Sequence, residues 1–313
     1  MAHRKIVPVT NADDARAAAN ASIMRRAALA SLGVSVLLVG LKAFAFFASG
    51  SVSVLASLAD SALDLFTSTL NLVAIRSALT PADDEHRFGH GKAEPLAGLA
   101  QGAFIAGSAT FLVVQAVNRF LEPQPVERGL PALIVMVVSI VFAVGLVLYQ
   151  RRVVQQTGSV AIGADNIHYL GDVATNAGVI VAILLAWGLG WEMADPIIAI
   201  LVAAVLIWSA WSVFRTSYDQ LMDRELPDAD REKIIAIITA HDEVRSLHDL
   251  RTRAAGVHAF IQFHIELDPA ISLMRAHQVS DEVERQLCAE FPHAEVIIHQ
   301  DPLGVEMPLT AGE

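Results

Sequence analysis

Two short stretches decide how this sequence is interpreted: residues 57–68, SLADSALDLFTS, and residues 164–176, ADNIHYLGDVATN. Each belongs to a largely apolar segment, and a membrane-spanning helix needs about 20 mostly apolar residues. Each also carries two metal-ligating side chains four positions apart, which places both on one helix face, one turn apart. The two pairs are Asp60 with Asp64 and His168 with Asp172. A carboxylate near the bilayer centre costs at least about 2.5 kcal/mol, so these residues are functional candidates.

The composition indicates a membrane protein. Hydrophobic residues make up 54% of the 313 residues and charged residues 18%, whereas soluble domains carry about 25% charged residues. Long uncharged tracts fill residues 27–214, and charges gather after Arg215. The net charge of −11 leaves no basic surface for nucleic acid. The single cysteine, Cys288, excludes a disulfide framework and a cysteine-rich zinc site, so a metal site must use His, Asp and Glu.

Six membrane spans are expected. They lie at about 28–48, 52–79, 94–119, 128–151, from about 159 to 192, and 195–215. Arginines and lysines favour one side of this arrangement, and the positive-inside rule places both termini in the cytoplasm. Lys42 interrupts the first span and is interpreted as a side chain that snorkels to the membrane interface.

The two intramembrane pairs predict a metal site. Two helix faces turned toward each other supply three carboxylates and one imidazole, the four ligands that a tetrahedral Zn²⁺ site requires. Metal ligands must be deprotonated, so metal and protons compete for the same groups, which suits antiport. Two other interpretations stay open: unrelated polar faces lining a water-filled vestibule, and a proton relay without metal.

A second candidate site follows the second span, where residues 81–92 read PADDEHRFGHGK. Pro81 and the two glycines indicate a turn-rich cytoplasmic loop. Asp83, His86 and His90 can converge on a metal there. Short acidic loops with two histidines also occur by chance, so a loop without metal is the alternative interpretation.

The remaining chain predicts a small soluble domain of order αββαβ, with its helices on one face of a sheet. Its elements are a helix at 227–244, strands at 247–256 and 257–268, a helix at 272–291 and a strand at 293–302. The expected organisation is a cytoplasmic tail at 1–23, a six-helix transmembrane domain at 24–220, a cytoplasmic metal-binding dimerisation domain at 221–306 and a tail at 307–313.

Histidines in this soluble domain suggest a binuclear metal site. His299 and Asp301 lie two positions apart in a strand, so both side chains point to the same sheet face. His248 and His264 come from the other two strands and can join them, and His277 lies in the second helix. For any one histidine, a surface or hydrogen-bonded role is the more ordinary interpretation.

The segments SLADSALDL, IHYLGDVATN and PADDEHRFGHGKAEPLAGL resemble the cation diffusion facilitators, most closely the YiiP-type bacterial zinc and ferrous-iron efflux pumps. The resemblance extends from about residue 20 to 305. It implies a homodimer in the bacterial plasma (inner) membrane that works by alternating access, driven by the proton gradient, with no organic cofactor. It also implies a transport site, a loop site and a binuclear site; the last adds Gln300 to the candidates above. Lys92 and Asp223 match a charge pair that interlocks the protomers.

Within this family, one histidine with three carboxylates is typical of Zn²⁺ or Cd²⁺ carriers, some of which also carry Fe²⁺. Two rival functions are weaker. An intramembrane metalloprotease often carries HExxH, which is absent, and needs an open metal position. A membrane-anchored metal sensor leaves the intramembrane Asp60 and Asp64 without a role. We therefore expect a transporter of divalent metal and not an enzyme.

Overall fold

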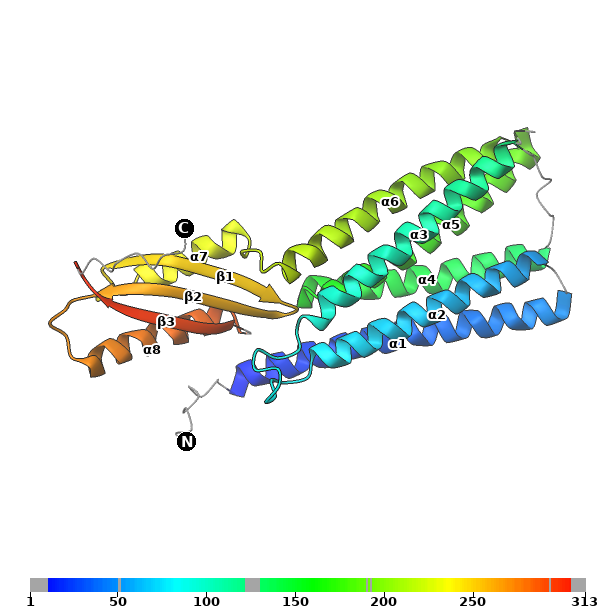
Figure 1. Ribbon diagram of the computed structural model, residues 1–313. Helices are drawn as coiled ribbons and strands as arrows, with labels where there is room; N and C mark the ends of the chain where they lie inside the picture. Colours follow the sequence, from blue (N-terminus) through cyan, green and yellow to red (C-terminus); the bar gives the residue numbers. More distant parts are fainter. Residues whose placement is uncertain are drawn as a thin grey trace. The chain divides into compact units, whose positions relative to one another are not determined.

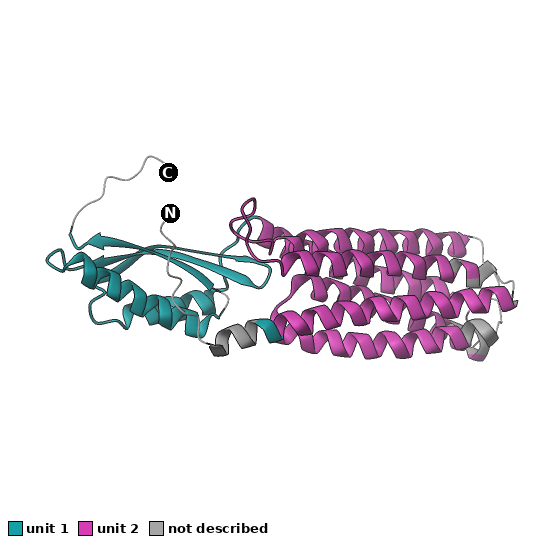
Figure 2. Cartoon of the chain, turned by 90° about the horizontal axis from the view of Figure 1, so that it is seen from below, with its two compact units in different colours: residues 1–19, 222–313 teal, residues 20–221 magenta. Residues whose placement is uncertain are grey.

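The computed structural model describes residues 11–49, 52–121, 130–189, 191, 193–292 and 294–304. The chain divides into two compact units, residues 20–221 and residues 222–313, the second joined by residues 1–19 (Figure 2). The predicted tail at 307–313 and the connection between the third and fourth helices lie outside the described residues.

Six long helices form the first unit (Figure 1). They are α1 (Asn11–Ser49), α2 (Val52–Ala78), α3 (Ala93–Leu121), α4 (Leu130–Thr157), α5 (Val160–Leu189) and α6 (Ala194–Leu221). Five of them, α1 to α4 and α6, are long and apolar enough to cross a membrane. Helix α5 is 30 residues long and packs against α3, α4 and α6 in the same bundle. The expected transmembrane helical region is confirmed.

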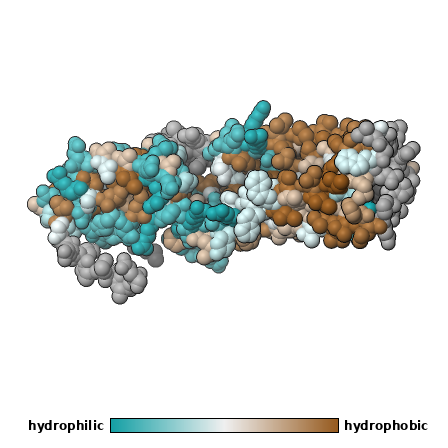
Figure 3. Space-filling model, turned by 90° about the horizontal axis from the view of Figure 1, so that it is seen from above, coloured by the Kyte–Doolittle hydropathy of each residue, from teal (hydrophilic) through white to brown (hydrophobic). Residues whose placement is uncertain are grey.

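The interior of the bundle buries polar side chains beside apolar ones, and large apolar side chains face outward. Ser35, Ser68, Asn71 and Asp165 are at most 1% exposed, whereas Trp208 is 76% exposed. Figure 3 shows the corresponding hydrophobic surface over this unit. A soluble domain would instead cover most of its surface with polar and charged side chains. The exposed apolar side chains are what a lipid environment stabilises.

Three helices extend well beyond the predicted spans, and one of them, α6, continues to Leu221, past the predicted end at 215. Helix α1 begins at Asn11, so half of the predicted tail at 1–23 is helical. Its first turns are rich in alanine, the strongest helix former, and the sequence from Asn11 to Arg26 contains no Pro or Gly to end it. Helix α4 continues to Thr157, past the charged residues after the span, and stops at Gly158, whose φ of 67° favours glycine.

The soluble unit has the predicted order αββαβ. Its elements are α7 (Asp228–Thr239), β1 (Ser246–Ala255), β2 (His258–Leu267), α8 (Leu273–Glu290) and β3 (Ala294–Pro302). Strand β2 is central, antiparallel to β1 and parallel to β3. The β1–β2 turn contains Gly256 with a φ of 63°, a conformation that glycine adopts without strain. Ser272 caps α8 by accepting a hydrogen bond from the Arg275 N–H.

One face of this sheet carries the core. Both helices pack on it through Ile234 and Ile238 of α7 and through Val279, Val283 and Leu287 of α8, against Ile261, Phe263, Ile265 and Val296 of the strands. Because side chains alternate along a strand, the neighbours of these core residues point to the opposite face. The sheet histidines lie on that opposite face.

Candidate metal centres

A carboxylate of α2 meets two ligands of α5 inside the bundle. The Nε2 atom of His168 lies 3.1 Å from Oδ1 of Asp64 and 3.9 Å from Oδ2 of Asp172. Ligand atoms of these three residues all lie within 4.8 Å of one another. The His168 side chain is 9% exposed and that of Asp64 is 16% exposed. The structure therefore brings together three of the four predicted transport ligands, drawn from the two helices that the sequence indicated.

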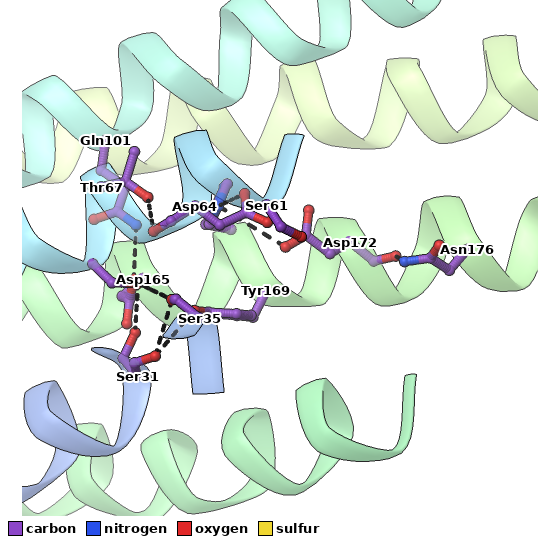
Figure 4. Close-up of polar contacts among 12 residues, drawn as sticks. Ser31, Ser35, Ser61, Asp64, Thr67, Gln101, Asp165, Tyr169, Asp172 and Asn176 are labelled. Atoms are coloured by element: carbon purple, nitrogen blue, oxygen red, sulfur yellow. Dashed lines mark hydrogen bonds and ion pairs between the residues drawn. The ribbon is translucent and has the colours of Figure 1, made fainter. Parts of the chain in front are cut away.

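The neighbouring residue, Tyr169, fixes the rotation of α5. Its hydroxyl lies 2.6 Å from Oγ of Ser35 on α1 and 3.1 Å from Oγ of Ser68 on α2 (Figure 4). It also donates to the carbonyl oxygen of Ser31 at 3.3 Å. Tyr169 is 1% exposed, so these bonds satisfy a hydroxyl that water cannot reach. Holding Tyr169 in this network keeps His168, one residue earlier, turned toward Asp64.

A cavity of about 710 Å³ surrounds the cluster and is lined by residues of α1 to α6. Asp60 lines this cavity one turn from Asp64, but its carboxylate is outside the close group of three. The role of Asp60 as fourth ligand stays a prediction.

Lys42 also lines the cavity, and here the sequence interpretation was wrong. Lys42 is 8% exposed and its Nζ donates to Oγ of Ser61 at 2.6 Å and to the carbonyl oxygen of Ser57 at 3.1 Å. The side chain does not snorkel to an interface. It turns inward because α2 offers acceptors and carboxylates on the facing side.

Asp165 is a buried carboxylate that the sequence analysis did not select. It is 0% exposed and accepts one amide hydrogen bond on each oxygen, from Gln101 of α3 at 3.0 Å (Figure 4) and from Gln150 of α4 at 2.6 Å. Its signal was its place three residues before His168, on the same helix face. Both oxygens are occupied by protein donors, so Asp165 ties α3, α4 and α5 together.

The loop residues Asp83, His86 and His90 do converge. Oδ1 of Asp83 accepts backbone N–H groups of Glu85 and His86, while Oδ2 lies 3.4 Å from Nε2 of His90. The bond from the His86 N–H is the main cause that lowers the pKa of Asp83 below its usual value, with the Glu85 N–H contributing. The Asp83 carboxylate is therefore charged and held by its own turn, with one oxygen directed to a histidine.

Register places three histidines in a row across the open face of the sheet. His248 pairs with His264, and His264 pairs with His299. Asp301, 5% exposed, lies between them: Oδ2 lies 2.8 Å from Nδ1 of His264 and 3.4 Å from Nε2 of His248, and Oδ1 lies 3.2 Å from Nε2 of His299. A carboxylate with different imidazoles at its two oxygens can bridge two cations, which fits the expected binuclear site.

Two predicted contributors point elsewhere within this chain. His277 lies on α8, where its side chain is 66% exposed and its Nε2 lies 3.6 Å from Asp281. Gln300 is next to His299 in the strand, so its side chain points to the opposite sheet face, toward α8, where its amide donates to Oγ of Ser280 at 2.7 Å.

The sequence analysis did not select Asp249, whose Oδ2 lies 3.9 Å from Nε2 of His264. A register irregularity between His248 and Arg251 brings it there, with an Asp249 φ of 49°.

Lys92 and Asp223, the residues of the proposed interlocking pair, lie in different units of the chain, and each has a partner within its own unit. Lys92 donates to the carbonyl oxygen of Leu221 at 3.5 Å, and Asp223 lies 3.2 Å from the guanidinium of Arg253. Their pairing between protomers stays a prediction. His241, which the sequence gave no metal role, lies 2.9 Å from Glu282.

Comparison with known proteins identifies the family. Residues 28–222 match the cation efflux transmembrane domain and residues 226–303 match the cytoplasmic domain of cation efflux proteins. The cation-efflux pump FieF of Klebsiella pneumoniae is 42% identical over 283 residues, covering 90% of this chain and 94% of the relative. FieF of Escherichia fergusonii is 43% identical with the same coverage. The metal-bound C-terminal domain of the CzcD transporter from Thermotoga maritima is 28% identical, covering 25% of this chain and 91% of that chain, with a TM-score of 0.24.

The relatives are transporters and not enzymes, and the two matched domains together cover almost all of the helical unit and the soluble unit. A multi-pass helical bundle, an αββαβ domain and ligand clusters in both parts agree with those matches. The chain belongs to the cation diffusion facilitator family and is a divalent-cation efflux transporter of the YiiP type.

Proposed function

We propose that this transporter exports Zn²⁺ from the cytoplasm in exchange for protons, as a homodimer in the bacterial inner membrane, and that Asp60, Asp64, His168 and Asp172 hold the transported ion. The observation that carries the proposal is the meeting of Asp64, His168 and Asp172 inside a cavity of the helical bundle. Burying carboxylates in a membrane helix is expensive unless a cation or proton compensates them.

The donor set supports zinc. Imidazole nitrogen and carboxylate oxygen suit Zn²⁺, which accepts four ligands in tetrahedral geometry. Harder ions such as Mg²⁺ prefer oxygen ligands alone and a higher coordination number. Fe²⁺ and Cd²⁺ accept the same donors, and their relative availability decides which is carried in the cell.

Placement of the ligands on separate helices supports alternating access. Asp64 belongs to α2, whereas His168 and Asp172 belong to α5. A small shift of one helix against the other changes all distances between the pairs, so a change of conformation can make or break the site. Protons that bind His168 and the carboxylates displace metal, because a protonated ligand cannot coordinate.

The cytoplasmic position of both termini is supported by the distribution of loop arginines and lysines, which favour one side of the membrane.

The match to the cytoplasmic domain of the family supports dimerisation through the soluble unit. The clusters at Asp83 and at His264 are proposed as cytoplasmic metal sites, and neither lies in the transport cavity.

The test is Zn²⁺ flux in reconstituted vesicles with an imposed pH gradient. The wild type should move Zn²⁺ toward the acidic side, and an ionophore that dissipates the gradient should stop net movement. Asp64→Ala and His168→Ala should abolish flux while size-exclusion chromatography still shows the wild-type oligomer. Full flux in both variants contradicts the site assignment. Metal binding without flux in the wild type favours the membrane-anchored sensor instead.

A further inference from the structure

Lys42 is the one basic side chain, apart from His168, among the described residues that line the transport cavity. We propose that its ammonium is the resident counter-charge of that cavity: it weakens the binding of the divalent cation and so allows its release. The inference rests on the proposed function, because it presumes that the cavity holds the transported ion.

The position of Lys42 is built by two contacts to α2. Nζ donates to Oγ of Ser61 at 2.6 Å and to the carbonyl oxygen of Ser57 at 3.1 Å. These acceptors lie on either side of Asp60 in the sequence, one helical turn apart. The ammonium is therefore held at the part of α2 that presents the carboxylates.

The placement of Lys42 changes the net charge of the cavity. Asp60 lies next to Ser61, the hydrogen-bond acceptor of Lys42, in the sequence, and Asp64 and Asp172 line the same cavity as Lys42. Three carboxylates and one ammonium leave the cavity with a net formal charge of −2, which one divalent cation neutralises. Without the ammonium, the same cavity would hold a divalent ion and still retain an excess negative charge.

The size of the effect follows from Coulomb's law. At an effective dielectric constant of about 20, Coulomb's law gives a weakening of more than a hundredfold for a unit charge about 10 Å from a divalent ion, and screening by water and salt reduces it, so about tenfold is the minimum expected. A transporter needs its cargo bound weakly enough to leave, since binding that is too tight slows release. Lys42 opposes the ion with like charge, whereas it stabilises the empty cavity.

A purely structural role of Lys42 predicts a different result. If Lys42 only tied α1 to α2, its hydrogen bonds would matter and its charge would not. Burying an ammonium for that purpose alone is costly, because the interior does not solvate it as water does. The serine hydroxyl can be removed separately from the charge, so the two roles can be separated.

The experiment measures equilibrium Zn²⁺ binding to the purified full-length protein by competition with a chelating dye. The background carries Asp83→Ala and His264→Ala, so that the two other ligand clusters do not contribute. Lys42→Met and Lys42→Gln should each bind Zn²⁺ about tenfold tighter or more. Lys42→Arg and Ser61→Ala keep the charge and should remain within about threefold of the background.

Thermal unfolding supplies a second readout. Without metal, Lys42→Met and Lys42→Gln should melt at lower temperature than the background, and added Zn²⁺ should raise their melting temperature by more. Lys42→Gln keeps an amide donor for the Ser57 carbonyl, so it remains informative if Lys42→Met does not fold. Unchanged or weaker Zn²⁺ binding in the neutral variants overturns the inference, and so does a Ser61→Ala variant that behaves like them.

One further variant separates this inference from the proposed function. Asp64→Ala in the same background should remove the remaining Zn²⁺ binding. If that binding persists in Asp64→Ala, the transport-site assignment itself is wrong. If it disappears in Asp64→Ala but is unchanged in Lys42→Met and Lys42→Gln, only the role of Lys42 is wrong.

Discussion

The cluster inside the membrane bundle and the cluster on the sheet use the same side chains on different backbones. Asp64 reaches His168 and Asp172 from another helix, and no backbone hydrogen bond links α2 to α5 at that point. His248, His264 and His299 lie on paired strands, whose backbone ladder fixes their spacing. Helices joined only by side chains can slide, whereas paired strands cannot change register without breaking the ladder.

This difference assigns different tasks to similar ligands. The proposed transport site has to open alternately to two sides, and this requires ligands on elements that can move against each other, as α2 and α5 can. A site on paired strands has its ligand spacing fixed by the backbone ladder, which suits the stable metal binding that we propose for it. Asp301 illustrates the point, because it is 5% exposed and contacts all three histidines, whereas Asp60 lies apart from its predicted partners.

The largest effect is expected at Asp172. Asp172→Asn keeps the size of the side chain but removes the charge that a Zn²⁺ ligand supplies. Loss of an outer-shell partner alone typically costs 10–100-fold in metal affinity or activity, so loss of a ligand should lower flux about 100-fold or more. Vesicle flux measures this, with Asp195→Asn as control, since Asp195 pairs with Arg119 and does not line the cavity. Equal flux in both variants would show that Asp172 is not a ligand of the transported ion.

The opposite result is expected at His264, the central histidine of the sheet. His264→Ala should weaken metal binding by the soluble unit at least about 10–100-fold. Vesicle flux should change by no more than about twofold, because His264 does not line the transport cavity and distant sites usually act independently. Flux and binding are measured on the same preparation. A loss of flux as large as that of Asp172→Asn would show that the sheet site is coupled to transport and is not only a stable metal holder.

A smaller change is expected in selectivity. His168→Asp replaces the only nitrogen ligand of the proposed transport site with oxygen, which favours harder ions. The ratio of Mn²⁺ to Zn²⁺ flux should rise on the order of tenfold. Competition between the two ions in the vesicle assay measures it. The matching change on the sheet, His299→Asp, should leave that ratio as it is, and an unchanged ratio in His168→Asp would contradict the ligand argument.

The smallest effect is expected on stability, where α3 packs against α6. A Cβ added at Gly98 of α3 would lie 2.3 Å from Oγ of Ser217 and 3.2 Å from Cγ1 of Val160. Gly98→Ala should therefore destabilise the bundle by about 1 kcal/mol through overpacking. The control is Gly145→Ala on α4, where nothing lies within 4 Å of the added Cβ. Melting temperatures in detergent compare them. Equal stability would mean that Ser217 rotates aside and α3 and α6 are not rigidly packed there.

Much of the fold followed from local patterns. Apolar length placed the helices, and alternation placed the strands of the αββαβ unit within one or two residues, because burial repeats with the period of each element. The helix before β1 was predicted to be too long, at 227–244. Helix α7 ends at Thr239, and the chain then turns through His241 before β1 begins at Ser246. The spacing Asp60/Asp64 and His168/Asp172 likewise indicated which helix faces to bring together.

Sequence alone determined which side chains are present and which face of its own helix or strand each occupies, since these depend on periods of 3.6 and 2 residues. Tertiary packing decided the rest. It selected Asp64, and not Asp60, as the partner of His168, turned Lys42 inward to Ser61, paired Asp165 with two glutamines, and directed His277 away from Asp301. These outcomes depend on how far neighbouring elements are shifted and rotated against each other, which no local period specifies.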